Sequence, residues 1–171
     1  MPPKQGQQSS QHNQKSKVAH FKPGQVHYTT LEGIPEGAPV LAGTFFVNDR
    51  PVMVLFDSGA SHTFISKECA LKLGLEVECL KSPYSIHSPG GQIFTDQMTR
   101  QVPLQLQGKI YPTYFIVLPT QKVDIILGMN WMEDRGVLLD TLSRTMHLQS
   151  STHGSMTLHL GNPKSLPLNC N

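Results

Sequence analysis

The chain has 171 residues, of which 15% are charged and 38% hydrophobic, and it contains 13 Pro and 14 Gly. This length suits one compact domain with tails, and this composition favours a loop-rich β protein over a helical bundle. The net charge of +2 is too small to indicate nucleic-acid binding by the whole chain. No apolar run reaches the length of a membrane-spanning helix, so we expect no membrane partner.

The three cysteines, Cys69, Cys79 and Cys170, form an odd set without the spacing of metal ligands. They indicate neither a disulfide framework nor a metal site, and a reducing compartment is the default for such a set. The N-terminus lacks the apolar core of a signal peptide. We therefore expect a soluble cytoplasmic protein that needs no metal and no cofactor.

The N-terminal segment is rich in Gln, Ser, Lys and His, and it has no Asp or Glu before Glu32. Such a segment cannot bury enough apolar surface to offset the entropy lost on ordering. We predict a disordered basic linker over residues 1–35, with a remnant of an RNA-binding region as the weaker interpretation. The folded domain is then expected over residues 36–161, followed by a flexible tail over 162–171.

Regular structure is predicted to begin near Val40. The apolar runs Val40–Val47 and Val52–Phe56 flank the turn residues 48–51 and predict a β-hairpin. The second run is almost continuously apolar, as in strands that are covered on both faces. It ends directly in Asp57, and an ionisable group at the end of a buried strand costs free energy unless it has a use. Asp57 is therefore the leading candidate for a functional residue.

A short helix is predicted over Ser66–Gly74, because Ser66 can cap its start and Gly74 can end it. A second hairpin is predicted over Tyr84–Phe94 around the Pro-Gly-Gly tip. The remaining predicted elements are strands and one short helix, in the order Gln101–Leu106, Tyr111–Leu118, Val123–Gly128, helix Met129–Asp134, Val137–Asp140, Thr145–Leu148 and Met156–Leu160.

The chemistry that suits Asp57 is peptide hydrolysis by two carboxylates that share one proton. At about 3 Å apart two such groups cannot both ionise, so one takes a proton from water and the other donates to the carbonyl oxygen. Ser58 can fix the carboxylate by bonding to a partner loop, and Gly59 lets a substrate backbone approach. The chain contains one Asp-Ser-Gly, so the second carboxylate must come from another copy.

Asp-Ser-Gly by itself is also an ordinary turn sequence. Three features favour the functional interpretation: the apolar run before Asp57, the glycine-tipped hairpin that follows, and the second buried run that ends at Gly128. Ser61 and His62 are adjacent, but neighbours in sequence rarely form a hydrogen-bonded nucleophile pair, and the segment lacks the Gly-x-Ser-x-Gly elbow.

Two segments, Val54–Ser66 (VLFDSGASHTFIS) and Val123–Met132 (VDIILGMNWM), resemble retropepsin-like aspartic proteases, with wording most similar to that of gypsy-type long-terminal-repeat retrotransposons of plants. The resemblance covers roughly residues 40–148. It implies a mostly β retropepsin-like acid protease fold, in which a closed barrel-like subunit carries one or two short helices. It also implies a homodimer with Asp57 of each subunit in a shared cleft.

The resemblance further implies roles for four sets of residues. Ser58 and Gly59 would support the catalytic carboxylate, and the residues implied to bind substrate are Gly59, Ala60, Ser61 and His62. The flap that closes over the substrate would be formed by Ser88, Pro89, Gly90 and Gly91. Structural support behind the active-site loop would come from Ile126, Leu127 and Gly128. Ser61 and Met129 depart from the retroviral pattern, which usually has Asp and often has Arg there. Because both charges are absent, no lone buried charge remains.

The expected function is that of an aspartic endopeptidase that acts as a homodimer and processes a retrotransposon Gag-Pol polyprotein, in the cytoplasm or within virus-like particles. The alternative is an inactive retropepsin-like dimer that serves as a binding or assembly module, because a fold does not fix a function. An RNA-associated structural protein has only the basic tail in its favour and lacks a zinc knuckle. Nucleic acid is not expected to bind the folded domain.

Overall fold

The computed structural model describes residues 21–38, 40–150, 152 and 154–163. Within these ranges the chain forms thirteen strands and two short helices. The elements are β1 (Lys22–Gln25), β2 (Leu41–Val47), β3 (Arg50–Phe56), β4 (Phe64–Ser66), α1 (Lys67–Lys72), β5 (Val77–Ser88), β6 (Gly91–Thr99), β7 (Val102–Leu106), β8 (Lys109–Thr113), β9 (Ile116–Leu118), β10 (Ile125–Leu127), α2 (Met129–Asp134), β11 (Leu138–Asp140), β12 (Thr145–Ser150) and β13 (Gly154–His159). The prediction of a mostly β protein with short helices is confirmed.

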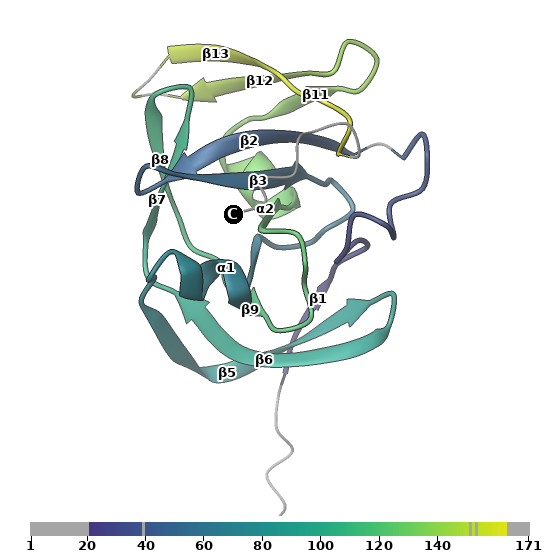
Figure 1. The fold of residues 1–171 in the computed structure, drawn as a ribbon, viewed down its shortest axis with the longest axis vertical. Helices are drawn as coiled ribbons and strands as arrows, with labels where there is room; N and C mark the ends of the chain where they lie inside the picture. Colours follow the sequence, from purple (N-terminus) through teal and green to yellow (C-terminus); the bar gives the residue numbers. More distant parts are fainter. Residues whose placement is uncertain (1–20, 39, 151, 153, 164–171) are drawn as a thin grey trace, which may run out of the picture.

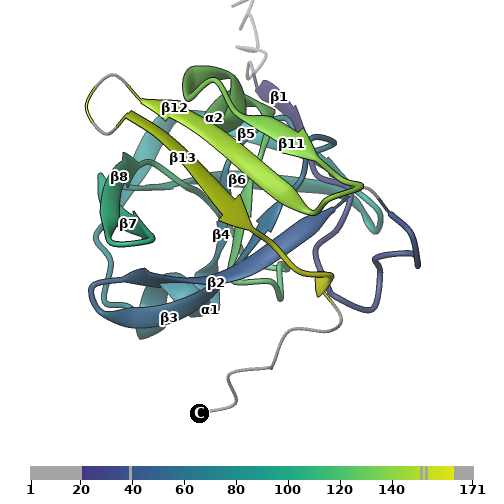
Figure 2. The same ribbon diagram turned by 90° about the horizontal axis from the view of Figure 1, so that it is seen from above.

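Ten strands form one continuous sheet in the order β1-β5-β6-β9-β4-β10-β3-β2-β7-β8. Figure 1 shows that this sheet is strongly curved, so that the β5–β6 hairpin and the β2–β3 hairpin lie on opposite sides of α1 and β9. The curvature produces a barrel-like body whose hydrogen-bonded order ends at β1 and β8. The remaining strands form a second sheet, β11-β12-β13, which Figure 2 shows side by side in the view from above.

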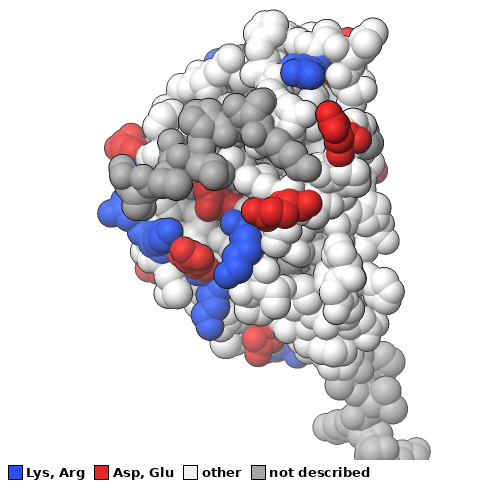
Figure 3. All heavy atoms as spheres, turned by 45° about the vertical axis from the view of Figure 1, so that its right-hand side comes forward, with Lys and Arg blue, Asp and Glu red and all other residues white. Residues whose placement is uncertain are grey.

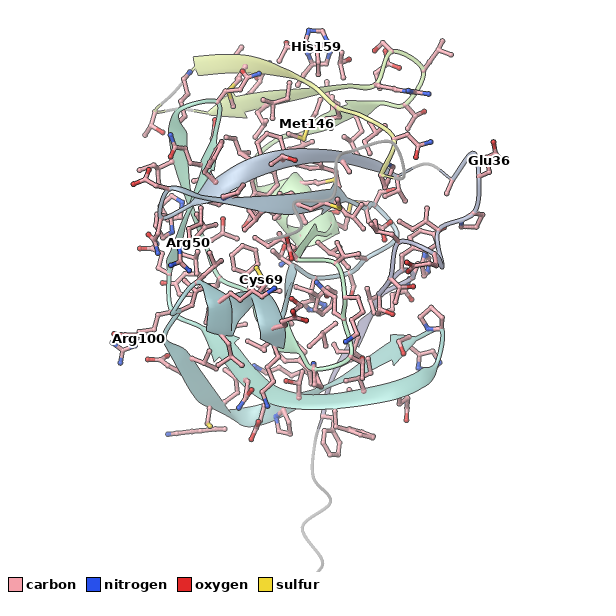
Figure 4. The ribbon with its side chains drawn as sticks, viewed as in Figure 1. Glu36, Arg50, Cys69, Arg100, Met146 and His159 are labelled. Carbon is pink, nitrogen blue, oxygen red and sulfur yellow. The ribbon has the colours of Figure 1, made fainter. Side chains whose placement is uncertain are left out.

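Alternating side chains of the smaller sheet cover the core. Met146 is fully buried and His159 is exposed, and Figure 4 shows them on opposite sides of this sheet. Beneath it, the Phe56 ring contacts the rings of Phe45 and Trp131 edge to face, with centroids 5.9 and 6.4 Å apart. Aromatic pairs of this geometry add to the free energy gained from burial alone. The end of β3, where Asp57 follows, is thus held inside a rigid aromatic cluster.

Two local predictions are confirmed in detail. β2 and β3 pair as an antiparallel hairpin from Leu41↔Phe56 to Val47↔Arg50. Asn48 and Asp49 turn the chain with φ of 48° and 62°, a conformation that Asn and Asp tolerate better than most residues. Ser66 caps α1, because its Oγ accepts a hydrogen bond from the Cys69 N–H at 3.0 Å.

One predicted strand is divided. The run Tyr111–Leu118 contributes to β8, which pairs with β7, and to β9, which lies between β6 and β4. At the break Phe115 is fully buried, and its N–H donates to the side-chain oxygen of Thr99 in β6 at 3.0 Å, and not to a backbone carbonyl. A continuous run of β-forming residues carries no signal for such a change of partner, so the sequence predicted one strand where there are two.

The predicted disordered linker is wrong for residues 21–35. Lys22–Gln25 forms β1, which pairs in parallel with β5, and Val26 and Ile34 are only 1% and 3% exposed. The segment is polar on average, but these two apolar side chains join the same buried cluster as Leu55 and Ile126, which anchors the segment to the domain. Residues 1–20 lie outside the described residues.

At the C-terminal end, Gly161 forms a β-bridge with Ala42, within the predicted domain. Of the tail predicted over 162–171, residues 164–171 lie outside the described part, and Pro163 is buried.

Neither helix in the described ranges is long and apolar enough to cross a membrane. On the face shown in Figure 3, acidic and basic side chains lie beside one another on a mostly uncharged surface, without a large patch of one sign.

Candidate active site

The backbone of Asp57 is fixed by two strands that are distant in sequence. β10 lies parallel to β3 with Leu127 opposite Phe56, and the Asp57 N–H donates to the Leu127 carbonyl at 3.1 Å. The Asp57 carbonyl then accepts from the Ala60 N–H at 3.1 Å, which closes a tight turn. The loop that carries Asp57 therefore begins from a rigid, fully paired base.

The Asp57 carboxyl group is nearly removed from solvent, with 3% of the residue exposed. Its Oδ1 accepts a hydrogen bond from the Gly59 N–H at 2.8 Å, whereas Oδ2 is buried and has no hydrogen-bond partner in the described part of the chain. Burial raises the pKa of Asp57, against the opposing effects of the Gly59 hydrogen bond and the charge of His27. The group is thus disposed to hold a proton, and one of its oxygens lacks a partner.

The Ile126-Leu127-Gly128 segment lies directly behind this loop. Gly128 has φ −94° and ψ −172°, a conformation open to any residue, so glycine is required by space and not by conformation. A Cβ at this position would overlap the His62 carbonyl oxygen and lie 2.7 Å from the Ala60 carbonyl oxygen. The Met129 N–H donates to that same Ala60 oxygen at 2.8 Å. Glycine at 128 therefore allows β10 and α2 to approach the loop closely.

The remaining loop residues lie at different depths. Ser58 is exposed, in a position open to a partner loop, and Ala60 is fully buried beneath it. Ser61 and His62 are partly buried, and the His62 ring packs against the rings of Phe64 and Tyr84. The loop thus exposes Ser58, turns Gly59 and Ser61 toward β1, and inserts Ala60 into the core.

Ser61 and His62 do form a hydrogen bond, with 2.7 Å between Ser61 Oγ and His62 Nδ1, so our expectation that these neighbours would not pair is wrong. Burial lowers the pKa of His62, which favours the neutral ring. The same hydroxyl lies 2.8 Å from the Gln25 nitrogen and 3.2 Å from the Gln25 carbonyl oxygen. It therefore links the loop to β1, a role that differs from that of a free nucleophile.

The hairpin with the proposed flap residues is long and ends in a free tip. β5 and β6 pair up to Ser88↔Gly91, and Ser88 Oγ donates to the Gly91 carbonyl at 2.7 Å. Pro89 and Gly90 at the tip are exposed, and Gly91 has a φ of 121°, which L-residues rarely adopt. In Figure 1 the tip forms one free end of the lower hairpin.

Sequence reasoning missed two residues that β1 and the segment directly after it bring to the site, Gln25 and His27. Gln25 donates from its side-chain nitrogen to the Gly59 carbonyl at 3.2 Å. The His27 ring lies so close to Gly59 that a Cβ there would overlap it, and its charge lowers the pKa of Asp57. The available signals were the aliphatic residues Val26, Leu31 and Ile34, which are scattered in an otherwise polar segment. In the described ranges no group of three or more His, Cys, Asp or Glu side chains could hold a metal ion.

We expect Gly128→Ala to destabilise the protein by about 3 kcal/mol, because the new methyl group meets two backbone carbonyls that cannot move without displacing the Asp57 loop. Gly90→Ala is the matched control, since a Cβ at Gly90 has no neighbour within 4 Å, and we expect a change within about 0.5 kcal/mol. Urea unfolding of the two variants measures the difference. Equal stabilities would contradict the described packing.

We expect Asp57→Asn to stabilise the protein by about 1 kcal/mol at pH 7, because a neutral amide replaces a buried carboxylate. The pKa of Asp57 is higher in the folded state than in the unfolded state, so the free energy of unfolding of the wild type falls as pH rises through the folded pKa. This loss of stability is absent below the unfolded pKa. The gain should therefore shrink at pH 3. Urea unfolding at both pH values tests this, and a gain of the same size at pH 3 and pH 7 would refute it.

Comparisons with known proteins identify the family and the fold of the chain. Residues 20–154 match the family model described as retroviral aspartyl protease. The protein DNA-DAMAGE INDUCIBLE 1 of Arabidopsis thaliana is 28% identical over 120 residues, which are 68% of this chain and 29% of that protein. The DNA damage-inducible protein 1 of Cryptococcus neoformans is 28% identical over 109 residues, 61% of this chain and 24% of that protein. The chain thus spans under a third of these relatives.

Among solved structures, the retroviral protease-like domain of Ddi1 from Leishmania major matches with a TM-score of 0.54 and 19% identity, over 75% of this chain and 96% of that domain. At this identity the match establishes the fold, and the expected retropepsin-like class is confirmed. The family match begins at residue 20 and therefore includes β1, in agreement with the corrected N-terminal boundary. The chain belongs to the retroviral aspartyl protease family.

Proposed function

We propose that this protein is an aspartic endopeptidase that acts as a homodimer, with Asp57 of each copy in one shared site. The observation that carries the proposal is the Asp57 carboxyl group, which is buried, has a raised pKa and leaves Oδ2 without a hydrogen bond in the described part of the chain. A buried polar atom without a partner costs about 1–3 kcal/mol. A second carboxyl group that shares a proton with Asp57 would remove this cost.

The chemistry follows from the shared proton. The ionised carboxylate takes a proton from a water molecule as that water attacks the carbon of the scissile amide, and the protonated carboxyl donates to the carbonyl oxygen. Burial supports this arrangement, since it raises the pKa of Asp57 and so favours the state in which the pair retains one proton. Ser58, exposed beside Asp57, is suited to hydrogen-bond to the partner loop and to hold the two loops together.

The substrate that fits the site is an extended peptide. The main-chain groups of Gly59 and Ser61 and the edge of β5 are suited to pair with an added strand, and in this structure β1 occupies them. Closure of the flap at Ser88–Gly91 would exclude water and position the bond.

The resemblance of the sequence to gypsy-type elements favours a retrotransposon polyprotein as the source of such peptides, in the cytoplasm or in virus-like particles. The curated relatives are DNA damage-inducible proteins, so a host protein is the competing source.

Asp57→Asn tests the catalytic role, because Asn keeps the shape of the side chain but cannot donate or accept the shared proton. With a library of internally quenched peptides, we expect cleavage to fall by at least about a thousandfold. Asp134→Asn, an exposed position on α2, serves as the matched control and should cleave at the wild-type rate. Cleavage by Asp57→Asn at the wild-type rate would sink the assignment, and a folded wild type that binds peptides without cleaving them would favour the binding-module alternative.

A further inference from the structure

β1 lies where the proposed function places the substrate. On one side it pairs in parallel with the flap strand β5, with Gly24 opposite Ile86 and Gln25 opposite His87. The Val26 N–H extends this pairing by donating to the His87 carbonyl at 2.8 Å. Figure 1 shows β1 running along the lower sheet toward the side where the loop after β3 lies. β1 thus adds a strand to the flap from within the same chain.

On its other side, the segment is bonded to the active-site loop. The Ser61 N–H donates to the Gln25 carbonyl at 3.0 Å, and the Gln25 N–H donates to Ser61 Oγ at 2.8 Å. The Gln25 side chain donates to the Gly59 carbonyl at 3.2 Å. The backbone of one residue therefore engages the loop while its neighbour engages the flap strand, which is the pattern of a peptide bound as an added strand.

The side chains of the segment are also accommodated individually. Val26 is 1% exposed and belongs to the apolar cluster that includes Ala60 and Ile86. Gly24 lies against two side chains, since a Cβ there would be 2.6 Å from Ile86 Cδ1 and 3.1 Å from His62 Nδ1. The position of Val26 thus takes an aliphatic side chain, whereas a side chain at the position of Gly24 would have to displace those of Ile86 and His62.

We propose that residues 22–27 are an internal ligand of the peptide groove, and that an external peptide binds only when this segment leaves. The proposal rests on the proposed function, because it takes the groove between β5 and the Asp57 loop as the peptide site. When a site is open for only a fraction of the time, the apparent affinity for an external ligand falls by that fraction. The segment therefore sets how readily the enzyme accepts a substrate.

The segment has the features of an element that can leave without unfolding the domain. β1 has only four residues and stands at the end of the large sheet, with β5 as its one partner strand. Lys22, Pro23, Gln25 and His27 are exposed, and the Lys22 side chain lies over the Tyr84 ring, with its ammonium 5.4 Å from the ring centroid. Short, exposed edge elements open at a lower free energy than the core.

The test is the binding of a fluorescein-labelled synthetic peptide that copies residues 21–29, measured by anisotropy on the full chain in an Asp57→Asn background so that no cleavage occurs. Two variants weaken the internal strand by different means. Gly24→Leu introduces a side chain against Ile86 and His62, and Gln25→Pro removes the N–H that donates to Ser61. Each should bind the labelled peptide about tenfold more tightly than the parent.

Glu36→Leu is the control, because Glu36 is exposed on the loop that Figure 4 shows at the outer edge of the molecule, and it should bind as weakly as the parent. Equal affinity in the parent, Gly24→Leu and Gln25→Pro would overturn the proposal. The readout is binding alone, so a wild type that cleaves no peptide would refute the proposed function and leave this result intact.

Amide hydrogen exchange on the wild type keeps the proposal falsifiable if a variant fails to fold. The Val26 amide is bonded to the His87 carbonyl, so it should be protected, though less than the Asp57 amide that anchors the active-site loop. Addition of an excess of the unlabelled peptide should raise the exchange rate of the Val26 amide. A Val26 amide that exchanges as fast as an unstructured one, or that does not respond to the peptide, would refute the internal ligand.

Discussion

The site depends on the contact between the end of β3 and the end of β10. One hydrogen bond, from the Asp57 N–H to the Leu127 carbonyl, fixes the backbone of the catalytic candidate. The absence of a side chain at Gly128 lets β10 and α2 lie directly against the Ala60 and His62 carbonyls. A loop that is fixed on both sides in this way can hold a carboxyl group out of water, which a mobile loop could not do. The raised pKa of Asp57 follows from that enforced burial.

Burial in turn supports the proposal that two copies of the chain complete one site. Asp57 loses hydration but gains only the Gly59 hydrogen bond on Oδ1. Oδ2 of Asp57 has no hydrogen-bond partner among the described residues, and the next residue in the chain, Ser58, is exposed. A second Asp57 loop would supply the missing partner and cover Ser58. In the proposed homodimer, the two buried carboxyl groups would share one proton across the symmetry axis.

Much of the site could be predicted because its signals are local. The turn Asn48–Asp49, the cap at Ser66 and the Pro-Gly-Gly tip each determine structure within a few residues, and the apolar run before Asp57 marks a buried strand. β1 could not be predicted, because its order comes from β5 and Ser61, which lie far along the chain, and not from its own composition. The same holds for the division between β8 and β9, where the Phe115 N–H donates a hydrogen bond to the side chain of Thr99. The Ser61–His62 bond likewise depends on the fold around it.

The central claim is that two copies of Asp57 form one site. Wild-type and Asp57→Asn chains can be mixed at a constant total concentration, allowed to exchange subunits, and assayed for peptide cleavage. If both carboxyl groups are required, only dimers of two wild-type chains cleave, so an equal mixture should retain about one quarter of the activity of the pure wild type. An equal mixture that retains about one half would show that each chain works alone and would contradict the account.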